Sequence, residues 1–169
     1  GEGLTWDLSA DGRKVLAMVS SPPQVVIYPT GAGEPQRLER GGLENYGLYG
    51  RWFPGGDSIL FLANEPGRAP RYFIQRLAGG PPRGVTPEGT RDGVLSGDGR
   101  LVLAKTPEGT YHIYPLAGGD PRLVPWLTAE DILIRMSVDG RSVLAARSSG
   151  VPSRVERIDL ESGRRTLFR

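Results

Sequence analysis

A short phrase of serine, any residue and then Asp-Gly-Arg recurs along this chain, each time directly before an aliphatic run. The copies begin at Ser9, Ser96 and Ser137, and a degraded copy begins at Phe53. Asp-Gly tolerates the positive φ of a hairpin turn, and the aliphatic residues that follow are typical of a buried strand. The turn glycines are Gly12, Gly56, Gly99 and Gly140. Their spacing of 41 to 44 residues predicts a repeat architecture.

A second phrase, which begins with isoleucine and ends in a glycine-bearing turn, accompanies the first. Its copies are Ile27-Tyr28-Pro29, Ile74-Gln75-Arg76, Ile113-Tyr114-Pro115 and Ile158-Asp159-Leu160. Each repeat therefore contains four strands, which is the size of one propeller blade. No segment has helical periodicity over about ten residues. We predict an all-β chain, one propeller domain or segment at 1–169, with four four-stranded antiparallel blades at about 1–42, 43–88, 89–128 and 129–169.

The sequence is compatible with two arrangements of these blades. The four blades form a closed ring, or they form an arc of a larger propeller. An arc exposes the apolar faces of its first and last blades, and such faces favour association. In that case two four-blade arcs are expected to pair as a homodimer with twofold symmetry.

The composition excludes several classes of protein. Cysteine is absent, so a disulfide framework and a thiolate metal site are excluded. No apolar run approaches the roughly 18 residues that span a bilayer, so direct membrane insertion is not expected. The formal charge is +2, and the arginines are interleaved with acidic residues and form no basic stripe, which argues against nucleic-acid binding. We expect no cofactor.

The residues that could be catalytic groups are better explained by structural roles in turns and strands. His112 is the sole histidine and has no cluster of ligands around it in the sequence, so we expect no metal site. The stretch 93–97 places its serine one position too late for a nucleophile elbow. Asp11, Asp98 and Asp139 lie in equivalent turns, where aspartate commonly accepts hydrogen bonds from its own backbone. We therefore predict that the chain is not an enzyme and has no catalytic residues.

The paired phrases resemble the TolB-like (WD-like) β-propeller repeat of bacteria over the whole chain. More narrowly, the stretches 27–35, 51–54 and 158–165 resemble the C-terminal propeller of bacterial eukaryotic-like serine/threonine protein kinases. Related propellers are attached to winged-helix regulators or to prolyl-oligopeptidase-like hydrolases. The resemblance implies a propeller whose channel mouth engages a protein or peptide partner.

Charged and aromatic residues at first-strand entries are the candidate binding residues, because inner strands line the channel of a propeller and the loops at their ends surround its mouth. They are Tyr46, Tyr49, Arg51, Arg91, Asp92 and Arg135. Trp and Arg dominate many interfaces, but Trp6 and Trp52 precede the turn phrase, where packing between blades is the ordinary role. We therefore predict that Trp52 is a core residue.

These observations predict a non-catalytic binding or sensory module of a bacterial signalling protein that engages a protein, peptide or small ligand. A gating propeller of a prolyl-oligopeptidase-like hydrolase, whose catalytic domain is absent from this sequence, is the first alternative. A purely structural oligomerisation fragment is the second. Attachment to a membrane-spanning kinase favours the periplasmic side of the membrane, and otherwise the cytoplasm is expected.

Overall fold

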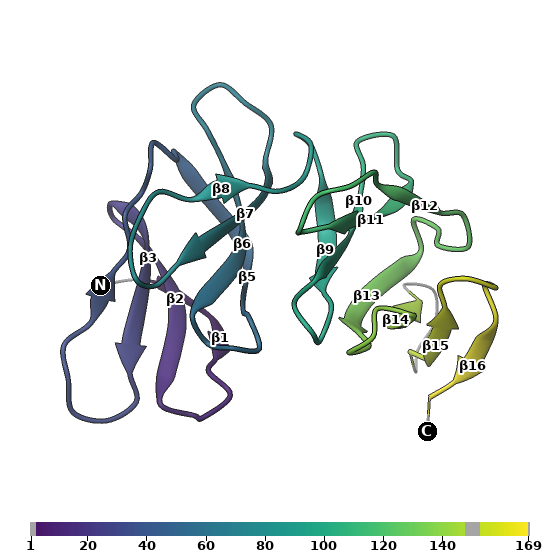
Figure 1. The fold of residues 1–169 in the computed structure, drawn as a ribbon, viewed down its shortest axis with the longest axis horizontal. Helices are drawn as coiled ribbons and strands as arrows, with labels where there is room; N and C mark the ends of the chain where they lie inside the picture. Colours follow the sequence, from purple (N-terminus) through teal and green to yellow (C-terminus); the bar gives the residue numbers. More distant parts are fainter. Residues whose placement is uncertain (1–2, 148–152, 169) are drawn as a thin grey trace. The chain divides into compact units, whose positions relative to one another are not determined.

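The computed structural model describes residues 3–147 and 153–168, and these contain sixteen strands and no helix. Four antiparallel sheets follow one another along the chain, each with its strands in sequence order (Figure 1). Blade 1 comprises β1 (Gly3–Leu8), β2 (Lys14–Ser20), β3 (Pro23–Pro29) and β4 (Gln36–Arg37). Blade 2 comprises β5 (Asn45–Trp52), β6 (Ser58–Asn64), β7 (Arg71–Arg76) and β8 (Arg83–Gly84). The prediction of an all-β chain with four four-stranded antiparallel sheets is confirmed.

The second half of the chain repeats this order. Blade 3 comprises β9 (Arg91–Leu95), β10 (Leu101–Lys105), β11 (Tyr111–Pro115) and β12 (Arg122–Val124). Blade 4 comprises β13 (Asp131–Met136), β14 (Ser142–Arg147), β15 (Val155–Asp159) and β16 (Arg165–Leu167). The chain divides into two compact units, Gly1–Gly89 with blades 1 and 2 and Thr90–Arg169 with blades 3 and 4. None of the described segments forms a helix of the length and hydrophobicity that crosses a membrane.

The turn between the first two strands of blades 1, 3 and 4 has one repeated hydrogen-bond pattern. In blade 3, Ser96 Oγ donates to Asp98 Oδ1 (2.6 Å) and accepts from the Leu101 amide (2.9 Å). Asp98 Oδ1 also accepts from the Arg100 amide (3.0 Å), while Gly99 adopts a φ of 74°. The aspartates of all three turns accept hydrogen bonds from their own turns, which confirms their structural role.

The core of the first unit lies between the facing sheets of blades 1 and 2. Leu16 and Ile27 of blade 1 are buried in one cluster with Ile59 and Phe61 of blade 2. Trp52 belongs to the same cluster and is 8% exposed, so the prediction that it is a core residue is confirmed. Alternate residues of each strand therefore face the neighbouring blade, which is how a sheet covers its apolar side.

Blades 3 and 4 form an equivalent core in the second unit. Leu103 and Ile113 of blade 3 are buried with Val143, Met136 and Ile158 of blade 4. The side of blade 3 that carries Leu103 thus faces blade 4.

The register of blade 4 corrects one part of the sequence alignment. Leu16 pairs with Ile27 in blade 1, and Leu103 pairs with Ile113 in blade 3. The corresponding leucine of blade 4, Leu144, pairs with Arg157 and not with Ile158. The matching of Ile158 to the isoleucines of the other repeats is therefore wrong by one residue. The amide that donates to the carbonyl of the turn arginine belongs to Leu160, two residues after Ile158, whereas Thr30 and Leu116 take this place three residues after their isoleucines.

The indole of Trp6 crosses from blade 1 to blade 2 above Gly50, where a Cβ atom would meet the ring. We expect Gly50→Ala to lower the free energy of unfolding by about 1–3 kcal/mol, because overpacking forces the ring and backbone to shift. Urea unfolding measures this change. Gly55→Ala is the matched control, since its nearest heavy atom would be 3.6 Å away. Equal unfolding midpoints for the two variants would contradict the packing described.

Candidate functional site

The first strand of every blade carries an irregularity that redirects side chains. The register shifts between Thr5 and Asp7 in β1 and between Leu133 and Arg135 in β13. In β5 three residues, 47–49, lie between the paired positions Tyr46 and Gly50. Bulges bend a strand and turn side chains away from the regular alternation, and they are frequent next to binding sites.

The three candidate residues of the first unit all lie on β5 but have different surroundings. Tyr46 packs its ring against Phe61 (centroids 5.7 Å apart), and burial raises its pKa although Arg40 partly offsets this. Tyr49 lies edge-on to Tyr72 (5.5 Å). Tyr46 and Tyr49 are thus partly engaged in packing.

Arg51 extends from blade 2 towards blade 1. Its Nη1 donates to Asp7 Oδ1 (3.1 Å), and the Trp52 amide donates to Asp7 Oδ2 (3.1 Å). Half of the Arg51 side chain remains exposed. Asp7 and Arg51 therefore join the two inner strands while the guanidinium still faces solvent. On the bulge of β5, between Tyr46 and Gly50, Leu48 is 83% exposed.

The structure brings two of the three candidates of the second unit together. Asp92 lies 3.7 Å from Lys105 Nζ and 3.8 Å from Arg91 Nε. Its φ of 50° is the only positive φ of a described residue other than glycine. Arg135 lies on β13 and is exposed, and its side chain has no hydrogen bond or ion pair with any residue of 3–147 and 153–168. Arg91, Asp92 and Arg135 thus present charge to solvent.

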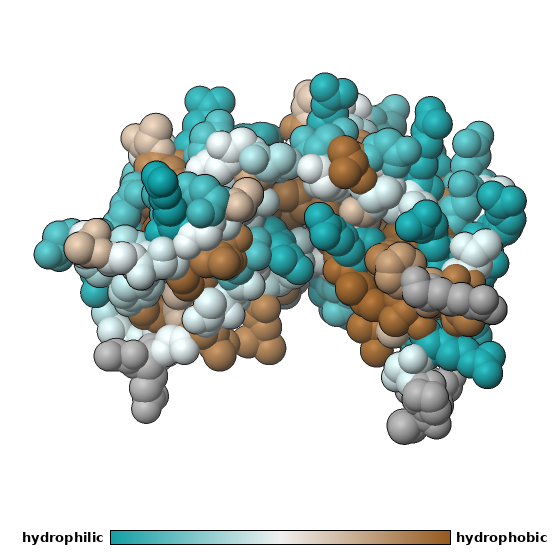
Figure 2. Space-filling view, turned by 90° about the horizontal axis from the view of Figure 1, so that it is seen from below, coloured by the Kyte–Doolittle hydropathy of each residue, from teal (hydrophilic) through white to brown (hydrophobic). Residues whose placement is uncertain are grey.

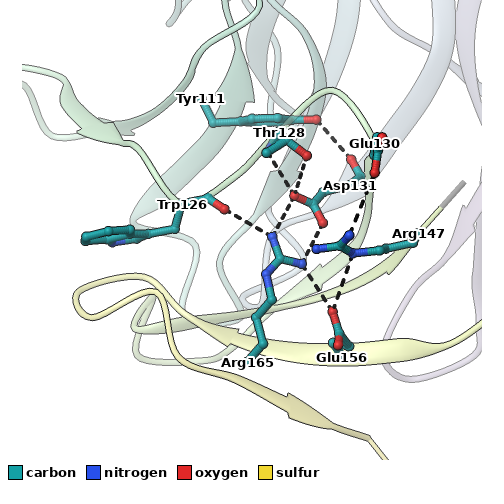
Figure 3. A network of polar contacts seen from close by, with 8 residues as sticks. All are labelled: Tyr111, Trp126, Thr128, Glu130, Asp131, Arg147, Glu156 and Arg165. Atoms are coloured by element: carbon teal, nitrogen blue, oxygen red, sulfur yellow. Dashed lines mark hydrogen bonds and ion pairs between the residues drawn. The ribbon is translucent and has the colours of Figure 1, made fainter. Parts of the chain in front are cut away.

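Sequence reasoning missed a network of ion pairs around Asp131 (Figure 3). Arg165 binds the Asp131 carboxylate through two hydrogen bonds of 2.8 Å, and its Nη1 also donates to Glu156 (3.2 Å). The Thr128 amide donates to Asp131 Oδ2 (2.8 Å). Burial raises the pKa of Asp131, but the hydrogen bonds from Arg165 and Thr128 outweigh it and hold the pKa below its ordinary value.

This network fixes the segment that leads from blade 3 into blade 4. Arg165 Nη2 donates to the Trp126 carbonyl (3.0 Å), and Tyr111 Oη donates to the Asp131 carbonyl (3.1 Å). Burial raises the pKa of Tyr111 to about 12. The charged residues of the network come from separate strands. The Thr128–Asp131 turn is the only part of the network whose residues lie close together in the sequence. We interpret the network as structural support for the start of β13, the first strand of blade 4.

A surface pocket of about 380 Å³ opens on the loop between β4 and β5. Its lining is Arg40, Gly42, Leu43, Glu44 and Pro66. Arg40 Nη2 donates to the Leu43 carbonyl (2.8 Å), so the guanidinium closes its own turn. Among the residues that the structure describes, no three or more His, Asp or Glu side chains are grouped as metal ligands.

Comparison with solved structures identifies the architecture. A protein described as a TolB of Agrobacterium tumefaciens matches with a TM-score of 0.74 and 15% identity, over 99% of this chain and 62% of its own. The chain has a TolB-like β-propeller fold. TolB of Acinetobacter baumannii also matches with a TM-score of 0.74 and 19% identity, over 98% of this chain and 43% of its own.

A prolyl endopeptidase structure matches as well, with a TM-score of 0.63 and 16% identity, over 98% of this chain and 28% of its own. The TolB-like chain therefore spans less than two thirds of each of these proteins. No protein-family model and no curated protein matches the sequence. At these sequence identities the comparisons establish the fold of the chain and do not establish an activity.

Proposed function

We propose that this TolB-like chain is a non-catalytic module that binds a protein or peptide through the inner strands of its blades. The observation that carries the proposal is the bulge of β5, which leaves Leu48 in solvent on the strand that also carries Tyr49 and the half-exposed Arg51. Exposed aliphatic, aromatic and arginine side chains are the usual components of a protein interface. In the second unit, Arg91, Asp92 and Arg135 supply exposed charged side chains on the first strands β9 and β13.

We further propose that this binding serves a bacterial signalling protein. The resemblance of three stretches of the sequence to kinase propellers supports this role. A rigid module that binds a ligand in one state of an attached effector shifts the equilibrium between its states. Sequencing the reading frame on both sides tests this part: a kinase domain with a membrane span supports it, and its absence contradicts it.

A gating propeller of a hydrolase is the second candidate, because a prolyl endopeptidase is among the structural matches. In that case the module restricts access to a neighbouring active site, and binding of a peptide is transient. A hydrolase domain encoded in the same reading frame supports this alternative. Peptides that stay bound with a micromolar or lower Kd contradict it.

Replacement of Leu48 tests the binding surface. We expect Leu48→Glu to weaken binding of peptides selected by display on the purified chain at least about tenfold, since a buried contact is lost and a charge is introduced. Fluorescence anisotropy with labelled peptides measures the change. Leu123→Glu on the outer strand β12 is the matched control, because Leu123 is also exposed. Equal Kd values for both variants and the wild type would overturn the assignment to the inner strands.

A further inference from the structure

Blade 3 places two cationic side chains opposite each other at the start of its first strand. Lys105 of β10 pairs with Arg91 of β9 in the antiparallel ladder. At the same distance from the turn glycine, blades 1 and 4 have apolar pairs, which are Met18 with Leu4 and Ala146 with Ile132. Like charges directly opposite each other destabilise a sheet. Lys105 and Arg91 therefore lower the stability of blade 3 relative to an apolar pair at the same place.

One carboxylate faces both of these cations. Asp92 Oδ2 lies 3.7 Å from Lys105 Nζ and 3.8 Å from Arg91 Nε, and both distances are longer than a hydrogen bond. Asp92 holds this place with a φ of 50°, in the left-handed region that residues other than glycine rarely adopt. More than half of its side chain is exposed. The carboxylate is thus shared, loosely held and open to solvent, and the group of three side chains keeps a net positive charge.

Lys105 is largely covered, although its side chain forms no hydrogen bond with any residue of 3–147 and 153–168. The side chain is 11% exposed. Its ammonium lies 5.9 Å from the centroid of the Tyr111 ring, which is held in place because Tyr111 Oη donates to the Asp131 carbonyl. A cation that is shielded from water attracts an anion more strongly than an exposed cation does. Lys105 therefore supplies a preformed positive charge beside a fixed aromatic ring.

The acidic residues at the start of β13 have other partners. Both carboxylate oxygens of Asp131 accept hydrogen bonds from Arg165, and Glu130 lies 3.8 Å from Arg147 (Figure 3). Figure 2 shows hydrophilic side chains spread over the visible face of the unit of blades 3 and 4, so exposed charge by itself does not mark a site. What distinguishes Lys105 is a covered cation whose one acidic partner can be replaced.

We propose that Lys105 and Arg91 form a carboxylate subsite of the binding surface, and that a carboxylate of the bound peptide displaces Asp92 from them. This inference rests on the proposed binding function and names the chemistry of one part of the partner. A carboxylate is the expected anion, because the two cations already face a group of this size and charge in Asp92. An acidic side chain and the C-terminus of a peptide supply the same group, and the experiment separates these two sources.

Acetate is the first probe, because it is the carboxylate alone. The chain has two lysines, Lys14 and Lys105, so selective ¹³C labelling of lysine gives one ε-carbon signal for each. We expect acetate, added at constant ionic strength, to shift the Lys105 signal in a saturable manner. The signal of Lys14, which is exposed in blade 1, should stay unchanged. Lys14→Met assigns the two signals.

Two substitutions are expected to change acetate binding in opposite directions. Asp92→Asn removes the competing charge and should lower the Kd for acetate at least about threefold, since asparagine tolerates the left-handed backbone as aspartate does. Arg91→Gln removes one of the two cations and should raise the Kd at least about threefold. A salt bridge with a structural role only predicts no gain of affinity in Asp92→Asn. Urea unfolding confirms that each variant is folded.

Peptides selected on the purified chain from a library with free C-termini test the source of the carboxylate. We expect replacement of one carboxylate by its amide to raise the Kd about tenfold in fluorescence anisotropy. Glutamine or asparagine at an acidic position identifies a side chain as the source, and a C-terminal amide identifies the terminus. Lys105→Met should abolish the difference between the carboxylate and amide peptides. Lys14→Met is the matched control and should preserve this difference.

Several results would overturn the inference. They are equal shifts of both lysine signals with acetate, an unchanged or weaker acetate affinity in Asp92→Asn, and selected peptides whose Kd does not depend on any carboxylate. In the last case peptides bind and the proposed function stands, so only the subsite is excluded. Acetate binding at Lys105 without binding of any peptide would contradict the proposed function, and with it the peptide as the source of the carboxylate. Saturable binding of inorganic phosphate but not of acetate would assign the two cations to a different anion.

Discussion

Replacement of Trp52 by alanine is expected to lower the free energy of unfolding by about 3–5 kcal/mol, and hence to unfold much of the protein at physiological temperature. Trp52 is 8% exposed and lies in the cluster that joins blades 1 and 2. Its removal leaves a cavity among Phe61 and its neighbours that closes only if the two sheets shift towards each other. Urea unfolding followed by far-UV circular dichroism measures the effect.

Trp126→Ala is the control for this experiment, because Trp126 is 43% exposed and belongs to neither buried cluster. Its replacement should lower the free energy of unfolding by less than the replacement of Trp52 does. A folded Trp52→Ala variant with an unchanged midpoint and weakened peptide binding would move Trp52 from the core to the binding surface.

Replacement of Asp131 by alanine is expected to have the second large effect on the stability of the protein. We expect the free energy of unfolding to fall by about 3–5 kcal/mol, because Arg165 would keep its charge in a largely buried place without its main partner. The Asp131 side chain is 1% exposed, and that of Arg165 is 20% exposed. The double variant Asp131→Leu with Arg165→Met removes both charges and is expected to recover part of the loss. A double variant as unstable as Asp131→Ala would contradict the pairing.

The same carboxylate predicts a pH dependence of stability. The pKa of Asp131 in the folded protein lies below its ordinary value of 3.8. A group with a lowered pKa contributes stability that is complete above the unfolded value and is lost as the pH falls through the folded value. The stability difference between the wild type and Asp131→Asn should therefore shrink as the pH falls below about 4. A constant difference between pH 7 and pH 3 would exclude this ion pair as the cause.

The repeat and its turns could be predicted from local chemistry alone. Ser96, Asp98 and Gly99 complete their hydrogen bonds within a few residues, so the phrase that contains them specifies the same turn wherever it occurs. The aliphatic runs after the turns specify strands for the same reason. The apolar character of Trp52 and its position before a turn were enough to assign it to the core.

The binding residues could be predicted only in part. The sequence indicates that Arg51 and Arg135 lie on inner strands, but their partners depend on bulges that shift the register by one or two residues. A shift of one residue reverses the direction of the side chains that follow, and neither the exposed Leu48 nor the packed Tyr46 carries a local signal of the bulge beside it. The binding role of Tyr46, Tyr49, Arg51, Arg91, Asp92 and Arg135 stays a prediction.

By itself the sequence determined the strands, the turns, the four-sheet order and the absence of cysteine chemistry, because these depend on residues close together in the chain. Only the tertiary structure decided that Asp131 meets Arg165, that Asp7 meets Arg51, and that Arg157 and not Ile158 matches the isoleucines of the other blades. Such pairs join residues about 30 to 45 positions apart, and their geometry follows from the stacking of sheets and not from the order of residues within any one strand.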